Sequence, residues 1–138
     1  MQRFAKALSA ILPLFFMALV PLIPAADKLD PGFAKWWAKF QTAVARHDVK
    51  IIALNAQFPL DWEVNSEIRA IRSESDLSAN FGLFFTPEIV KNVAAGHPEK
   101  LPNGNYMVVW KARGNQYSLI VRSYAGTFAL DSLGEGPP

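Results

Sequence analysis

The chain has 138 residues, of which 51% are hydrophobic, 12% aromatic and 19% charged, with 14 Lys and Arg against 12 Asp and Glu. A composition this apolar and aromatic excludes a disordered chain, and the lack of cysteine excludes a disulfide framework, a cysteine–zinc site and a thiol nucleophile. The formal charge of +2 and the sequence pI of about 9.0 suggest, at first, a mildly basic protein with an anionic partner.

The first 26 residues have the pattern of a secretory signal peptide. Arg3 and Lys6 give a basic start, residues 7–23 are uncharged and apolar, and Pro24-Ala25-Ala26 forms a small-residue end before Asp27. An uncleaved membrane anchor is the alternative, but this apolar run is short for a span and contains prolines. We therefore predict a signal-peptide helix that is cleaved, and export to the periplasm or the medium.

Removal of this segment changes the charge of the protein. Arg3 and Lys6 are its two cations, so residues 27–138 keep 12 cations and all 12 acids and are formally neutral. Phosphate binding needs a surplus of clustered cations, so a nucleic-acid partner is not expected. A membrane contact is expected only through the signal segment before its cleavage.

Four helices are predicted in the first part of residues 27–138. Asp30-Pro31 begins the first helix, because aspartate caps free N–H groups and proline suits the first helical position. At helical spacing its large apolar residues share one arc, which predicts a buried stripe. They are Phe33, Trp36, Trp37, Phe40 and Val44. Lys35, Lys39 and Arg46 fall on the opposite side, and overall neutrality favours a merely solvated surface there.

The other three helices are shorter. Asp48 is the predicted cap of a helix over Val49–Leu54, and Ser73 begins a third helix that continues to Phe84. Thr86-Pro87 begins the fourth, which ends at Gly96.

Five strands are predicted from runs of β-branched and aromatic residues. Their expected ranges are 58–64, 68–71, 106–112, 117–124 and 127–130, with 131–138 as a loose tail. In the third strand Tyr106, Val108 and Trp110 share one face. The order of elements predicts a single α+β domain over residues 27–138, with N-terminal helices packed on a curved antiparallel sheet.

The stretch FAKWWAKFQTAVARHDVKIIALNAQFPLDW resembles the opening of nuclear transport factor 2-like (NTF2-like) domains. The residues that carry this resemblance are Phe33, Trp36, Trp37, Phe40, Ala43, Arg46, Asp48 and Ile52. The order of Phe58-Pro59-Leu60 and Phe85-Thr86-Pro87 also resembles a group of small secreted bacterial proteins of unknown function. The resemblance implies a cone in which a bent sheet wraps a long helix and the open end often forms a pocket.

The same fold carries enzymes, ligand binders and dimerisation modules, so chemistry must be sought in the residues. Asp61 and Glu63 share one strand face and are the candidates for acid–base work in the cone, although alternation favours a solvated face. His47 and His97 fit a helix end and a surface turn better than a catalytic or zinc site. No catalytic residue, metal ligand or cofactor is therefore predicted.

The aromatic residues offer the remaining site. Most of them fit a core, but some are candidates to line an apolar pocket with polar tips. The pocket candidates are Trp62, Tyr106, Trp110 and Tyr117. A third use of such residues is an exposed sheet face that forms a homodimer.

The sequence thus predicts an exported binding or interaction module of the bacterial cell envelope, more consistent with a non-catalytic role than with an enzyme. Its expected partner is a small apolar ligand or a protein. The alternatives are an isomerase- or dehydratase-type enzyme with Asp61 or Glu63 in the cavity, and a dimeric structural module.

Overall fold

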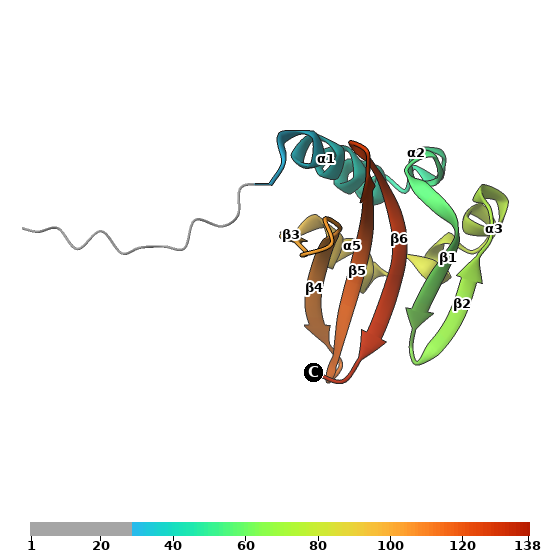
Figure 1. Ribbon diagram of the computed structural model, residues 1–138. Helices are drawn as coiled ribbons and strands as arrows, with labels where there is room; N and C mark the ends of the chain where they lie inside the picture. Colours follow the sequence, from blue (N-terminus) through green and yellow to red (C-terminus); the bar gives the residue numbers. More distant parts are fainter. Residues whose placement is uncertain (1–28) are drawn as a thin grey trace, which may run out of the picture.

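The computed structural model describes residues 29–138, so the predicted signal peptide lies outside the described residues. Five helices pack on one face of a curved six-stranded sheet (Figure 1). In chain order the elements are α1 (Pro31–Ala45), α2 (Val49–Leu54), β1 (Ala56–Val64), β2 (Glu67–Ile71), α3 (Glu74–Ala79), α4 (Phe81–Phe84), α5 (Pro87–Ala94), β3 (Glu99–Lys100), β4 (Tyr106–Ala112), β5 (Asn115–Tyr124) and β6 (Thr127–Gly136). The α+β class is confirmed.

The predicted helix starts are confirmed, and each has a side-chain cap. The carboxylate of Asp30 accepts a hydrogen bond from Gly32 N, and that of Asp48 accepts one from Ile51 N. Ser73 and Thr86 cap α3 and α5 in the same way. Capping residues act on the three backbone N–H groups next to them, so local sequence is sufficient to place these ends.

The strand order β2-β1-β6-β5-β4-β3 differs in one respect from the predicted antiparallel sheet. β1 and β6 run parallel, whereas every other pair of described strands is antiparallel, so the sheet is mixed. β1 is the first strand along the chain, and β6 returns beside it after α3–α5 and the three antiparallel connections β3–β4, β4–β5 and β5–β6. A long crossover of helices and strands makes this pairing feasible.

The prediction that residues 131–138 form a loose tail is wrong. β6 continues from Thr127 to Gly136 and lies in the middle of the sheet, between β5 and β1. Leu133 is buried at 2% exposure and lies opposite both Leu119 and Trp62. Asp, Ser and Gly are poor strand residues, so this segment is extended because it is paired on both sides rather than because of its own propensity.

Smaller differences from the prediction occur elsewhere along the chain. The third helix is divided at Asn80 into α3 and α4. The two-residue strand β3 was not predicted, and β5 begins at Asn115, which shortens the preceding turn to Arg113-Gly114. Both turn residues have positive φ, which fits a two-residue hairpin with a right-handed twist.

The core lies between α1, α5 and the inner face of the sheet. Phe33 is fully buried, and its ring stacks on that of Tyr106 with centroids 3.5 Å apart and an interplanar angle of 1°. Gly96, two residues after α5, allows the chain to approach β4 and α1 closely, because an added Cβ would lie 2.7 Å from Val108 Cγ1 and 3.3 Å from Trp37 Cζ2. The predicted aromatic stripe of α1 is therefore core, with Trp36 only partly buried.

Candidate functional site

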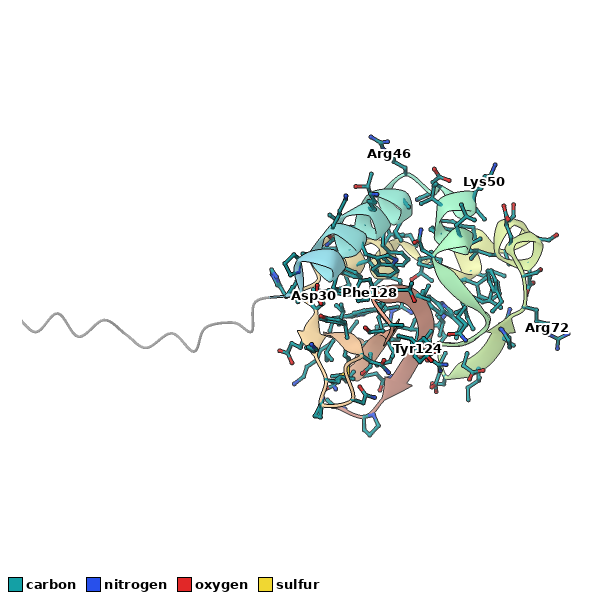
Figure 2. The ribbon with its side chains drawn as sticks, turned by 45° about the horizontal axis from the view of Figure 1, so that its top comes forward. Asp30, Arg46, Lys50, Arg72, Tyr124 and Phe128 are labelled. Carbon is teal, nitrogen blue, oxygen red and sulfur yellow. The ribbon has the colours of Figure 1, made fainter. Side chains whose placement is uncertain are left out.

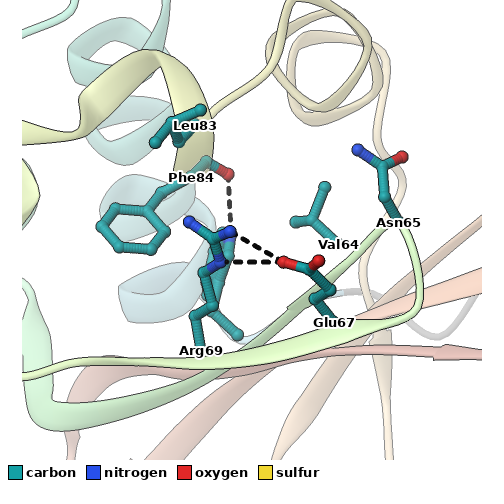
Figure 3. A pocket seen from close by; sticks show the side chains of 7 residues that line it. Val64, Asn65, Glu67, Arg69, Leu83 and Phe84 are labelled. Atoms are coloured by element: carbon teal, nitrogen blue, oxygen red, sulfur yellow. Dashed lines mark hydrogen bonds and ion pairs between the residues drawn. The ribbon is translucent and has the colours of Figure 1, made fainter.

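A groove lies at one end of the sheet, between α4 and the inner side of β1 and β2 (Figure 3). Its volume is about 270 Å³. Three segments line it: β1 with the turn after it, β2, and α4. Their lining residues are, in that order, Trp62, Val64 and Asn65; Glu67 and Arg69; and Leu83 and Phe84. These three segments meet only in the folded chain, so the groove has no contiguous sequence signature.

The floor of the groove is apolar and fixed in position. Trp62 and Phe84 are buried at 1% and 5% exposure, and Trp62 Nε1 donates a 2.6 Å hydrogen bond to the carbonyl oxygen of Phe84. This bond satisfies the indole and joins β1 to α4, so it holds both sides of the groove together. Leu83 projects beside it and remains 57% exposed.

The rim of the groove is polar. Arg69 donates to Glu67 from both Nε, at 3.2 Å, and Nη2, at 2.7 Å. Both side chains are more than half exposed, so this ion pair adds little to stability. It does present an oriented guanidinium and a carboxylate next to the apolar floor, which is the combination that orients a mainly apolar ligand.

The four predicted pocket residues do not lie in one cavity. Trp62 lines the groove, and Tyr117 borders an adjoining hollow of about 30 Å³. Trp110 stacks on Tyr117 at 5.7 Å between centroids, and Tyr106 stacks on Phe33; all four residues are at most 8% exposed. Three of the four are therefore placed chiefly as core, and the groove instead uses Leu83 and Arg69, which the sequence did not single out.

Asp61 and Glu63 lie on the outer face of the sheet, opposite Trp62. Asp61 is exposed, and Glu63 Oε2 accepts a 3.2 Å hydrogen bond from the backbone N–H of Glu135. Together with Ile68 they border an outer depression of about 400 Å³ rather than the groove. Their position argues against the alternative in which these two carboxylates do acid–base work inside the cone.

The two histidines lie where the local patterns predicted. His47 follows α1 with a φ of 53° and contacts the ring of Phe81, at 4.8 Å between centroids, while Asp48 caps α2. His97 is exposed in the loop before β3. Within residues 29–138, His, Asp and Glu side chains do not gather in groups of three or more that could hold a metal ion.

A second polar cluster, centred on Glu135, closes the same end of the sheet. The Glu135 carboxylate accepts hydrogen bonds from Ser66 N at 2.9 Å, from Asn115 Nδ2 at 2.6 Å and from the Tyr117 hydroxyl. The bond from Ser66 N is the largest reason why the pKa of Glu135 lies below 4.5, and burial raises the pKa of Tyr117 above 10.0. The cluster thus holds an ionised carboxylate and a protonated phenol, and ties β6 to the β1–β2 turn.

We expect Glu135→Gln to reduce the free energy of unfolding by about 1–2 kcal/mol near neutral pH, since bonds to an ionised acceptor are weakened. A lowered pKa in the folded state contributes stability above the unfolded value of 4.5, and this contribution disappears as pH falls through the lower folded pKa. Urea unfolding at neutral and at acid pH should therefore show that the difference in free energy of unfolding between wild type and variant becomes smaller as the pH falls. The exposed Glu99, changed to Gln, is the control, and an equal response of both variants would contradict the assignment.

No helix within the described residues is long and apolar enough to cross a membrane. This finding concerns residues 29–138 and leaves the apolar run of residues 7–23 outside it.

Comparisons with known proteins give no family assignment. No protein-family model matches the sequence, and no curated protein shows a significant match. A candidate ketosteroid isomerase from Shewanella frigidimarina aligns at a TM-score of 0.49 and 9% identity, covering 78% of this chain and 96% of that one. A de novo designed protein with a curved β-sheet aligns at 0.44 and 14% identity, covering 75% and 95%.

A candidate association domain of a calcium/calmodulin-dependent protein kinase II from Xanthomonas campestris aligns at a TM-score of 0.42 and 13% identity, covering 77% of this chain and 85% of that one. All three TM-scores are below 0.5, so the activities in these names are not transferred to this chain. The class defined by its own coordinates is α+β, with helices on one face of a curved mixed sheet.

Proposed function

We propose that this chain is an exported NTF2-like binding module of the cell envelope, non-catalytic, that holds a small apolar ligand or an apolar segment of a protein partner in the groove beside α4. The observation that carries the proposal is the groove itself, with a floor of Trp62 and Phe84, an exposed Leu83 and the Arg69–Glu67 pair at the rim. The arrangement of a long helix against a curved sheet supports the NTF2-like assignment made from the sequence.

Native mass spectrometry of the protein purified from its own host tests several parts of this proposal together. The mass of the polypeptide reports whether residues 1–25 or 1–26 have been removed, and any excess mass reports a retained ligand. A full-length mass would contradict cleaved export. The stoichiometry separates a monomer with ligand from a dimer.

The groove can be tested separately with the apolar fluorescent probe Nile red. We expect Leu83→Gln to weaken binding of the probe about fivefold to tenfold, because part of an apolar contact is replaced by a polar amide. Leu54→Gln is the matched control, since Leu54 is 73% exposed on α2, away from the groove. Equal binding by both variants, or stronger loss with Leu54→Gln, would count against the groove as the site.

A dimeric structural role has one observation in its favour. The outer face of the sheet exposes Val109 on β4 and Ile68 on β2, at 41% and 73% respectively. Between them this face carries Asp61 and Glu63 of β1 and the small residues Ser132, Gly134 and Ser118. A dimer in the native spectrum would favour this second function, and a bare monomer would count against both functions.

A further inference from the structure

Charge is distributed unevenly over the neutral domain. Residues 31–50, which form α1 and begin α2, carry four cations and the single acid Asp48. Residues 56–99 carry seven acids and three cations. The domain is therefore neutral because the excess of cations in residues 31–50 is balanced by an excess of acids in residues 56–99. The electrostatic field close to α1 is consequently positive.

The cations of α1 form one continuous stripe. Lys35, Lys39 and Arg46 are exposed, and with Thr42 between them they follow the spacing of one helix face over about 16 Å. They lie opposite the buried stripe that contains Phe33 and Phe40, so the core fixes the direction in which they point. Arg46 projects outward on the same side of the molecule as Lys50 of α2 (Figure 2).

α2, which packs against α1, carries exposed apolar side chains of its own. Leu54 is 73% exposed and Ile51 38% exposed. Lys50 and Leu54 are four residues apart in the helix and therefore share a face. An exposed leucine beside a lysine fits an interface at which cations meet headgroups and leucine enters the acyl boundary.

We propose that this face, made of the α1 stripe with Lys50, Ile51 and Leu54 and here called the basic helical face, docks on the surface of a membrane that contains anionic phospholipid. Charge complementarity supplies the attraction, at about 1 kcal/mol for each Lys or Arg near such a surface. Apolar contact by Leu54 and Ile51 favours a lipid surface over a nucleic acid, whose phosphate backbone offers no acyl region.

The position of the apolar segment in the sequence agrees with this orientation. Only residues 24–30 separate the apolar run from Pro31, the first residue of α1. Seven extended residues span at most about 25 Å, so α1 stays near the bilayer as long as the segment is attached. Docking by the basic helical face would then keep the domain at the membrane after cleavage. This inference does not depend on the groove.

Co-sedimentation of the mature chain, residues 27–138, with vesicles tests the proposal; this chain contains the whole core described above. We expect binding to vesicles of phosphatidylglycerol and phosphatidylcholine in equal parts at low salt, and loss of binding at high salt or with phosphatidylcholine alone. The combined variant Lys35→Gln, Lys39→Gln and Arg46→Gln should bind about a hundredfold more weakly.

The matched control carries Lys91→Gln, Lys100→Gln and Lys111→Gln, which removes the same charge from exposed positions on α5, β3 and β4. It should bind like the wild type, and unchanged unfolding midpoints would show that both variants fold. Leu54→Ser should weaken binding without altering its salt dependence. The proposal would be overturned if both triple variants lost vesicle binding equally, or if the protein bound neutral vesicles. It would also be overturned if duplex DNA displaced the protein from anionic vesicles as strongly as added anionic vesicles do.

Discussion

Deletion of residues 131–138 is expected to abolish cooperative folding of the domain. The deletion removes the half of β6 that pairs with β5 on one side and with β1 on the other, together with the buried Leu133 and the Glu135 carboxylate. Loss of one buried leucine alone costs about 2–5 kcal/mol, and a domain has only about 5–15 kcal/mol in total. Urea titration followed by tryptophan fluorescence should show no sigmoidal transition.

A shorter deletion provides the control for this result. Pro137 and Pro138 follow the end of β6 and are exposed, so their removal should change the free energy of unfolding by no more than about 0.5 kcal/mol. A cooperative transition in the protein that lacks residues 131–138 would mean that the second half of β6 is dispensable, contrary to its central position.

Phe33→Ala is expected to reduce the free energy of unfolding by about 3–5 kcal/mol. Phe33 is fully buried where α1 crosses the sheet, and its ring is stacked on Tyr106 and meets Phe128 edge to face at 5.3 Å. The truncation would therefore leave a cavity bordered by rigid aromatic rings, which relax into empty space less readily than flexible side chains. Urea unfolding of the mature chain measures the loss.

Phe33→Leu separates burial from ring stacking. Leucine keeps most of the buried apolar volume but not the aromatic contacts, so we expect a loss of about 1–2 kcal/mol. A loss below about 1 kcal/mol with Phe33→Ala would show that α1 is not anchored to the sheet through this residue.

The helical part of the fold was predictable because its determinants are local. A cap acts through hydrogen bonds to adjacent N–H groups, so Asp30, Asp48 and Thr86 each specify a helix start wherever the helix later packs. The buried stripe of α1 was likewise visible, since helical spacing alone collects its aromatics on one side. Strand alternation also placed Tyr106 and Trp110 correctly on one face of β4, which the structure shows to be the buried face.

The second half of β6 was not predictable by the same means. Gly134 and Gly136 favour turns when judged by propensity, and only the neighbouring strands make this segment extended. The parallel pairing of β1 with β6 joins segments about seventy residues apart, which no local pattern reports. Because residues 131–138 were predicted to be a loose tail, the position of Glu135 beside Ser66 and Asn115 was not foreseen.

The candidate site was predictable only in part. Trp62 was identified because aromatic residues on a strand suggest a pocket wall, and it does line the groove. Leu83 and Arg69 belong to other elements and become relevant only when α4 and β2 meet β1. The basic stripe was visible in the sequence, but the neutrality of residues 27–138 led us to interpret it as a merely solvated surface.

The central place of β6 also governs when the protein can acquire its structure during synthesis. The β1–β2 hairpin is synthesised before the other strands, but two strands alone are only marginally stable in water. The strand that pairs with the other edge of β1 is β6, which consists of residues 127–136. A nascent chain on the ribosome cannot complete the sheet until these residues have been translated, because the distant pairing must wait for both members. The domain therefore lacks a complete sheet for most of its synthesis, whatever helices have already formed.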